Sequence, residues 1–432
     1  MIRSALLAPT HLDMAISKRP INRSGYTLNL LALSSALALG ACSSDAPTRM
    51  GLAGAAGDGA ADMPASGASG AAGAGGSTGA LSVGGTASAG TAGSKASGGS
   101  GGSLPEVSSE GDGDIIVGPD YPKDPYLTDL GKPRGKRFSF TMHSQDSKIF
   151  KGDDATLTKP AKKTNWDRGI TVYVPAQYKD GTEAPILVIQ EGQIDNVSRA
   201  LDNLTISTDR LKKLPAFIAI AINNGNDRDG ADGQGSERGL EYDTLSDRYT
   251  RFVDTEVLPA VLADPMIKAA FPSLKLTSDP DGRGTMGCSS GGAAALTMGW
   301  FGGDKYRRII TYSGTFVDQQ NHSQPEAKIY PFGAWEYHSE LELIKNAAKK
   351  PLRIFLDASE NDNGATAPES SHHNWVMANQ RTAAALKDKQ YHYRFTFAKT
   401  LGHCDQKVFD LTLADTLSWV WRGYGAERVA PP

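Results

Sequence analysis

The sequence predicts an α/β fold in which helices cover both faces of a mostly parallel central sheet, preceded by a disordered linker. Two continuous apolar runs, at residues 186–190 (ILVIQ) and 217–222 (FIAIAI), are typical of strands buried on both faces of a sheet. Strand-like and helix-like segments alternate over residues 169–421, and this alternation favours a doubly wound sheet. A span of about 300 residues can fold as one domain.

Each remaining element is expected from a local pattern. Residues 169–174 (GITVYV) alternate and are rich in β-branched side chains, which favours a strand. Apolar residues at helical spacing over residues 243–262 predict an amphipathic helix. Further strands are expected at residues 308–312, 352–356 and 393–397. Further helices are expected at residues 291–300, 340–348, 379–387 and 407–421.

The N-terminal segment has the features of an export signal. A basic patch at residues 18–23 precedes an apolar run at residues 28–41, and the run ends in small residues. The run is too short to span a bilayer comfortably. Its last residues and Cys42, in the order Leu-Gly-Ala-Cys, resemble a bacterial lipobox. We therefore expect a lipoprotein signal peptide over residues 1–41 and a lipid anchor at Cys42 in the cell envelope; an ordinary signal peptide with an incidental cysteine is the alternative.

A low-complexity segment follows the signal. Gly accounts for 18 of the 53 residues at 51–103, and most of the others are Ala, Ser and Thr. Such a segment buries too little apolar surface to offset its chain entropy. We expect a disordered tether over residues 42–118 and one folded domain over residues 119–432.

The charge balance argues against a nucleic-acid partner. The chain carries 45 basic and 48 acidic residues, a formal net charge of −3, whereas nucleic-acid-binding domains usually carry a basic stripe. The adjacent His372 and His373 have no further ligands at zinc-like spacing. No metal and no cofactor is therefore expected.

Residues 287–291 (GCSSG) fit the G-x-S-x-G pattern of a serine nucleophile. In that pattern the serine lies on a sharp turn from a strand to a helix, and glycines are needed where a side chain would collide with neighbouring backbone. The small residues that follow would let a helix pack closely on the sheet. The preceding residues (RGTM) have weak apolar character for a strand. The pattern predicts Ser289 as the nucleophile.

An acid and a base follow in the order expected after such a nucleophile. His403 comes shortly after the strand expected at residues 393–397, where a catalytic base should lie. Carboxylates follow the strand expected at residues 352–356, at the carboxyl end where α/β sheets place catalytic groups. Asp362 is the favoured acid and Glu360, on the same expected loop, is the alternative.

These residue types predict acyl transfer through a covalent intermediate. His403 would take the proton of Ser289 and return it to the leaving alcohol, while the carboxylate orients the imidazole. The backbone N–H of Ser290 would form half of an oxyanion hole. The N–H of Gly192 or Gln193, after the strand expected at residues 186–190, would form the other half.

The cysteines predict a disulfide beside this site. Of the three cysteines, Cys288 precedes the nucleophile and Cys404 follows the base, while Cys42 is expected to be lipidated. In an oxidising compartment the first two are left to pair. Two buried free thiols are the alternative.

At these residues the chain resembles the enterochelin-esterase-like esterases, an α/β-hydrolase group that also holds feruloyl and acetylxylan esterases. The matching stretches lie at residues 142–149, 172–178, 187–192, 238–247, 287–292, 351–362, 401–403 and 418–421. The resemblance implies an α/β-hydrolase fold with nucleophile, acid and base at Ser289, Asp362 and His403. The chain departs from the pattern at Glu191, where Asp is frequent, and at Cys288, which is usually apolar. The Cys-Ser and His-Cys pairs resemble a disulfide arrangement of tannase-type feruloyl esterases.

Four further residues are weaker candidates for substrate contact. Trp335 and Trp375 could stack on a sugar or phenolic ring, although packing in the core or at its rim is the more ordinary role. Glu237 and Arg238 could orient a substrate or simply form a surface pair.

Together these features predict an exported, lipid-anchored serine esterase that acts on a sugar, phenolic or siderophore ester, free or linked to a polysaccharide. Two alternatives remain at this point: a non-catalytic surface lipoprotein that binds a ligand with the same fold, and an acyltransferase that uses the same three residues.

Overall fold

The computed structural model describes residues 111–152, 167–225 and 237–425. The expected signal peptide, the lipidation site at Cys42 and most of the expected tether lie outside these residues. Within the described ranges, none of the helices combines the length and the apolar composition that a membrane span requires.

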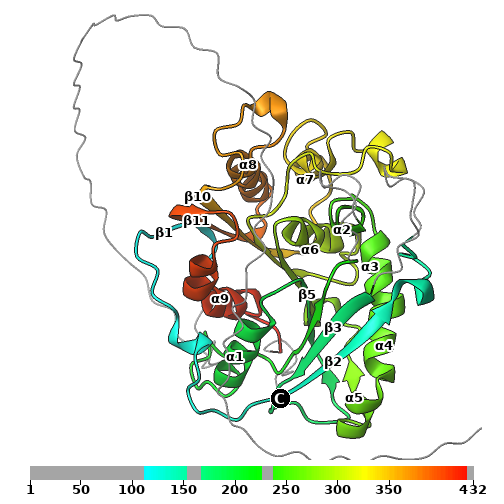
Figure 1. Cartoon of the computed structure of the whole chain (residues 1–432). Coiled ribbons are helices and arrows are strands. Elements are labelled where there is room, and N and C mark those ends of the chain that lie inside the picture. Colours follow the sequence, from blue (N-terminus) through cyan, green and yellow to red (C-terminus); the bar gives the residue numbers. More distant parts are fainter. Residues whose placement is uncertain (1–110, 153–166, 226–236, 426–432) are drawn as a thin grey trace, which may run out of the picture. The chain divides into compact units, whose positions relative to one another are not determined.

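A mixed sheet forms the centre of the described part of the chain (Figure 1). Its strands are β1 (Gly113–Val117), β2 (Lys136–His143), β3 (Asp167–Val174), β5 (Ile186–Gln190), β6 (Ile218–Ile222), β8 (Arg283–Cys288), β9 (Arg308–Tyr312), β10 (Arg353–Asn361) and β11 (His392–Gly402). Their order is β1-β11-β10-β9-β8-β5-β6-β3-β2. All neighbours from β1 to β6 run parallel, whereas β3 is antiparallel to both β6 and β2. The short strands β4 (Glu183–Ala184) and β7 (Lys275–Leu276) pair separately.

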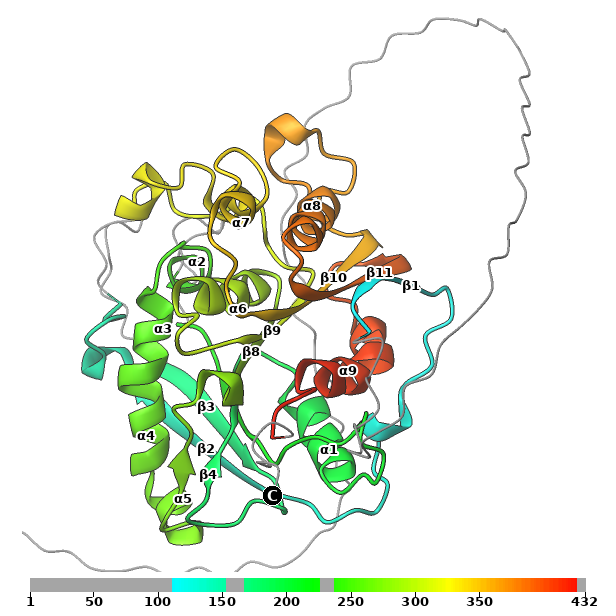
Figure 2. The ribbon, with the colours of Figure 1, turned by 180° about the vertical axis from the view of Figure 1, so that it is seen from behind.

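Helices cover both faces of the sheet, as the two opposite views show (Figures 1 and 2). The longer helices are α1 (Ile194–Leu204), α6 (Ser290–Phe301), α8 (Trp375–Asp388) and α9 (Gln406–Val420). The shorter ones are α2 (Glu237–Tyr242), α3 (Arg248–Phe252), α4 (Leu258–Ala263), α5 (Pro265–Ala270) and α7 (Leu343–Asn346). Alternate side chains of β5 point to opposite faces: Leu187 and Ile189 pack with α1 and α9, whereas Ile186 and Val188 pack with α3, α4 and α6. Both faces of β5 are therefore buried, which explains its continuous apolar sequence.

The predicted α/β fold with a mostly parallel sheet is confirmed. The strands expected at residues 186–190 and 308–312 begin and end where they were predicted. The segment before the expected nucleophile, whose apolar character is weak, is nevertheless the buried strand β8. Its Arg283 is accommodated because the guanidinium bonds Asp254 and the Tyr306 hydroxyl.

Three expected boundaries are wrong. The folded domain begins before residue 119, because β1 pairs in parallel with β11 at the edge of the sheet. The helix expected over residues 243–262 begins only at α3 and reaches α4 through a π-helical turn at Val253–Val257. The helix expected at residues 340–348 is reduced to α7, because Glu340 and Glu342 have positive φ angles of 49° and 44°.

A buried ion pair fixes α2 against the sheet. Arg168 on β3 bonds both carboxylate oxygens of Glu241 on α2, and both side chains are fully buried. The guanidinium also donates to the carbonyl oxygen of Asn223 at 2.5 Å and lies 4.8 Å from the Phe252 ring centre. Because buried charges are costly unless they are paired, each member of this pair depends on the other.

We expect Glu241→Ala to lower the free energy of unfolding by about 3–5 kcal/mol, because it leaves the Arg168 charge buried without its carboxylate. Urea denaturation of the folded domain measures this loss. Asp195→Ala is the matched control: it removes the carboxylate of the exposed Arg137–Asp195 pair and should change the same quantity by less than about 1 kcal/mol. Equal losses for the two variants would contradict the assigned role of the buried pair.

Candidate active site

The nucleophile candidate lies on a strained turn between β8 and α6. Ser289 has φ 58° and ψ −131°, a conformation that side chains rarely adopt, and it directly precedes the first residue of α6. A side chain at Gly287 would meet the Gly291 carbonyl oxygen at 2.2 Å, and one at Gly291 would meet the Gln190 carbonyl oxygen at 2.8 Å. The strand–turn–helix context expected for the motif is therefore present, and both glycines are required by close backbone approach.

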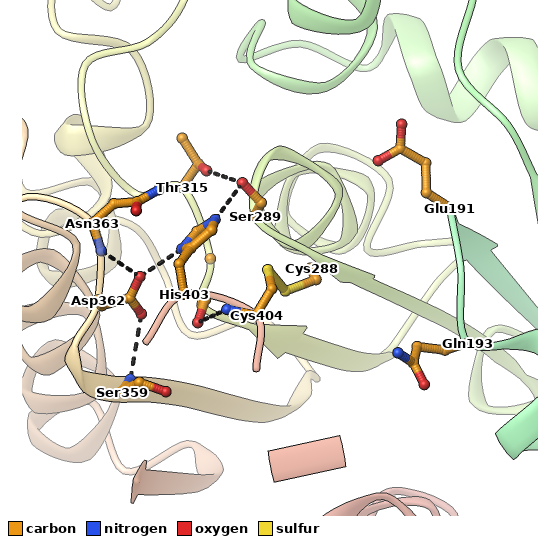
Figure 3. Close-up of a disulfide and its surroundings, with 12 residues drawn as sticks. Glu191, Gln193, Cys288, Ser289, Thr315, Ser359, Asp362, Asn363, His403 and Cys404 are labelled. Atoms are coloured by element: carbon orange, nitrogen blue, oxygen red, sulfur yellow. Dashed lines mark hydrogen bonds and ion pairs between the residues drawn. A yellow bond between two sulfur atoms is a disulfide. The ribbon is translucent and has the colours of Figure 1, made fainter. Parts of the chain in front are cut away.

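Three side chains from the ends of three parallel strands meet at this turn (Figure 3). His403 follows the last residue of β11, and its Nε2 atom lies 2.9 Å from the Ser289 hydroxyl oxygen. Its Nδ1 atom lies 2.5 Å from a carboxylate oxygen of Asp362, which follows the last residue of β10. Ser289 is half-buried, the His403 side chain is 17% exposed and that of Asp362 is fully buried.

The structure places Asp362, and not Glu360, against the imidazole. The N–H groups of Asn363 and Ser359 donate to the Asp362 carboxylate at 2.8 and 3.3 Å. Glu360 lies on β10 rather than on the expected loop, and its carboxylate is exposed. It accepts hydrogen bonds from the Thr400 N–H and the Lys399 ammonium, which lower its pKa.

A second buried carboxyl group lies near Asp362. Asp357, inside β10, is 1% exposed. Burial raises the pKa of Asp357 well above its usual range, and the nearby Asp362 charge adds to the rise. Asp357 therefore keeps its proton more readily than an exposed carboxyl group does.

The structure contains the expected disulfide. Cys288 and Cys404 are bonded, with their Cα atoms 6.2 Å apart and 116 positions apart in sequence. The bond joins the residue before Ser289 to the residue after His403, as Figure 3 shows. The Cys404 N–H also donates to the Ser313 hydroxyl at 3.2 Å. The exits of β8 and β11 are thus covalently joined at the site.

Two of the expected oxyanion-hole residues, Gly192 and Gln193, line a small cavity that also contacts the disulfide. The cavity, about 150 Å³ in volume, is lined by the loop after β5, including Gly192 and Gln193, and by the disulfide. Both residues have positive φ, as does the preceding Glu191, so the backbone turns sharply here. Ser290 opens α6, and the first N–H groups of a helix have no partner within it.

A polar network behind Ser290 could not be predicted from the sequence. The Ser290 hydroxyl donates to a carboxylate oxygen of buried Asp243 at 3.1 Å. Burial raises the pKa of Asp243 to about 7; the Arg238 guanidinium and the Ser290 hydrogen bond oppose the rise, and Glu191 adds to it. Arg238 and Glu191 themselves form an ion pair. Each lies in a stretch that matches the family, but nothing in the sequence indicates that the two residues are in contact.

Arg238 and Glu191 form a bidentate pair near the rim of the site. The guanidinium donates to both carboxylate oxygens at 3.0–3.1 Å, and both side chains are about one-third exposed. Burial alone would lower the pKa of Arg238, but the adjacent carboxylate outweighs this effect and raises it. Arg238 therefore pairs with Glu191 and not with a surface partner at Glu237.

The other three candidates for substrate contact are buried. Glu237 is 1% exposed at the start of α2, and Trp335 is fully buried against the rings of His338 and His372. Trp375 is 8% exposed, and its ring meets the edge of the His403 ring with centres 6.1 Å apart. Stacking of a substrate ring on Trp335 is therefore excluded in this arrangement, and Trp375 contacts the imidazole instead.

Comparison with models of protein families assigns the chain to a family. A family model described as "Putative esterase" matches residues 161–420, more than half of the chain. The chain belongs to this esterase family. The family resemblance indicated by the sequence motifs is thereby confirmed. No match was found among the curated proteins.

Solved structures of other esterases are similar to this member of the family. A ferulic acid esterase is 16% identical, with a TM-score of 0.45, and the match covers 67% of this chain and 99% of that protein. A ferulic acid esterase from Anaeromyces mucronatus, in complex with ferulic acid, is 13% identical (TM-score 0.46; 70% and 96% covered). The ferric enterobactin esterase from Salmonella typhimurium is 18% identical (TM-score 0.41; 66% and 58% covered). The match therefore spans only a little over half of the Salmonella protein.

We expect the stability of the folded domain to depend on pH through Asp243. Its pKa is about 7 in the fold and about 3.9 in an unfolded chain. Between about pH 4 and about pH 7, the folded state therefore keeps a proton on Asp243 that the unfolded chain loses. The free energy of unfolding thus falls as pH rises through this range. The variant Asp243→Asn cannot titrate and should lack this fall, while its amide oxygen still accepts from Ser290.

Urea denaturation of both proteins at half-unit pH steps measures the difference. The free energy of unfolding of the unmodified protein should decline relative to that of Asp243→Asn across this window and run parallel to it above pH 8. Parallel curves throughout would show that Asp243 titrates normally.

Proposed function

We propose that this esterase is a serine carboxylester hydrolase in which Ser289 is the nucleophile, His403 the general base and Asp362 the orienting acid. One observation carries the proposal: the His403 ring bonds the Ser289 hydroxyl with one nitrogen and the Asp362 carboxylate with the other. A serine hydroxyl becomes a useful nucleophile only when such a base accepts its proton.

The geometry supports a two-step reaction. With the Nδ1 proton held by Asp362, the Nε2 atom of His403 is free to take the Ser289 proton as the hydroxyl oxygen attacks the ester carbonyl. The imidazolium then gives this proton to the leaving alcohol, and an acyl-enzyme remains. His403 takes a proton from water in the second step, the hydroxide attacks the acyl carbon, and Ser289 regains its hydrogen.

The charge that develops on the carbonyl oxygen needs hydrogen-bond donors. The Ser290 N–H at the start of α6 is one proposed donor, and the positive end of the helix dipole adds to its effect. The N–H of Gly192 or Gln193, in the loop that follows β5, is the other proposed donor.

We further propose that the substrate is an ester of a sugar, phenolic acid or siderophore. The partial exposure of Ser289 and His403 is compatible with such a substrate, because an ester group carried on a larger molecule can reach a half-buried hydroxyl at the edge of the sheet.

We expect Ser289→Ala to lower kcat by more than about 10³-fold, because only binding and the oxyanion donors would remain. Chromogenic acetyl, butyryl and feruloyl esters measure the activity, and a fluorophosphonate probe measures reactivity of the hydroxyl. Ser313→Ala, which removes a neighbouring hydroxyl outside the triad, is the control and should keep labelling. Absence of both hydrolysis and labelling in the unmodified protein would favour a binding protein, and products that depend on an added alcohol would favour an acyltransferase.

We also propose that the chain is exported and anchored to a membrane through lipidated Cys42. The basic patch, the short apolar run and the Leu-Gly-Ala-Cys order support this location. The full chain, expressed in a bacterium, should fractionate with membranes, and Cys42→Ala should shift it to the soluble fraction. Equal distribution of the two proteins would exclude an anchor at Cys42.

A further inference from the structure

We propose that Thr315, oriented by Trp375, is a positioning residue that holds the Ser289 hydroxyl with its proton directed at His403. This inference rests on the proposed function, because it assigns a role to groups around the same nucleophile. It gives a task to a buried hydroxyl and a buried indole for which the sequence motifs provide no role.

Thr315 is tied to the nucleophile by backbone as well as side chain. It lies in the segment after β9, and its N–H donates to the Ser289 carbonyl oxygen at 3.0 Å. The Ser289 N–H in turn donates to the Tyr312 carbonyl oxygen at 3.0 Å. Thr315 is 1% exposed. Its side-chain oxygen lies 3.4 Å from the Ser289 hydroxyl oxygen, on a different side from His403 (Figure 3).

Trp375 sets the direction of the hydrogen bonds. Its indole N–H lies 3.1 Å from the Thr315 side-chain oxygen and can only donate, so that oxygen must accept from it. The Thr315 hydrogen then remains available for the Ser289 oxygen. With His403 Nδ1–H directed at Asp362, Nε2 needs a donor, and Ser289 has only one hydrogen to give. Donation from Trp375 to Thr315 to Ser289 to His403 is the arrangement that satisfies all four groups.

Trp375 also contacts His403 and the residue that follows Asp362. Its backbone N–H donates to the Asn363 carbonyl oxygen at 3.1 Å, and Asn363 N–H donates to the Asp362 carboxylate. The edge-to-face contact of its ring with His403 limits how far the imidazole can swing. One residue at the start of α8 thus touches the segment beside the nucleophile, the base and the residue after the acid.

The start of α8 is itself held firmly. The side-chain amide of buried Asn379 donates to the carbonyl oxygens of Gly314 and Trp375 at 2.8 and 2.9 Å. The side chain of Asn374 caps the helix by accepting from the Met377 N–H at 2.9 Å. These hydrogen bonds fix the distance between the indole and the segment after β9.

The role of Thr315 is one of orientation. Its contact with Ser289 is 0.5 Å longer than that of His403 (3.4 against 2.9 Å), so His403 remains the proton acceptor. As the Ser289 proton moves to Nε2, negative charge grows on the hydroxyl oxygen, and donation from Thr315 strengthens. Thr315 keeps its own proton throughout, and no bond to it forms or breaks.

A double-mutant cycle tests this role on an ester that the unmodified protein hydrolyses. Thr315→Val keeps the shape and removes the hydroxyl, and it should lower kcat by about three- to tenfold with little change in KM, as expected for one neutral hydrogen bond. Thr315→Ser keeps the hydroxyl and should retain most of the activity. Trp375→Phe, which removes the indole N–H, should cause a similar loss in kcat.

The combined variant is the decisive one. If Trp375 acts through Thr315, the double variant Thr315→Val with Trp375→Phe should have a kcat no lower than that of the less active single variant. Three results would overturn the inference. The first is a loss in kcat for the double variant that equals the product of the two single losses. The others are an unchanged kcat in Thr315→Val and an equal loss in Thr315→Ser and Thr315→Val. Thermal unfolding identifies a variant that fails to fold, and the rate of fluorophosphonate labelling repeats the test without substrate binding. An unmodified protein that neither hydrolyses esters nor reacts with the probe would instead refute the proposed function itself.

Discussion

The contact of one imidazole with a hydroxyl and a carboxylate is the constraint on which the rest of this structure depends. His403 can bridge Ser289 and Asp362 only because β8, β10 and β11 run parallel and end at the same edge of the sheet. β9 lies between β8 and β10, and the backbone at and after its end forms hydrogen bonds with the backbone of Ser289. Burial of the Asp362 carboxylate keeps water from competing for the imidazole.

The sequence predicts those parts of the fold that are apolar on both faces. β5 and β9 were placed correctly because every residue in them is buried. β8 has an arginine and two glycines, and its burial depends on partners far away in the chain, such as Asp254. β1 was assigned to the tether because five residues next to a Gly-rich segment give no periodicity, and only pairing with β11 makes them a strand.

Some features of the site can likewise be predicted from neighbouring residues in the sequence, whereas others depend on contacts that form only in the fold. Ser289, His403 and the disulfide could be predicted because a short motif and adjacent cysteines identify them in the sequence. The selection of Asp362 over Glu360 required the end of β10 to be known, because Glu360 still belongs to the strand and Asp362 is the first residue after it. The contacts of Asp243 with Ser290 and of Arg238 with Glu191 join segments about fifty residues apart and have no local signature.

The disulfide has a consequence for the denatured chain. Ser289, Asp362 and His403 all lie inside the covalent ring that Cys288 and Cys404 close, and the first and last residues within that ring are the proposed nucleophile and the proposed base. Ring closure restricts the unfolded ensemble. Even when every strand is lost, the hydroxyl and the imidazole remain neighbours across a single cystine, so heat or urea can release Asp362 without separating Ser289 from His403.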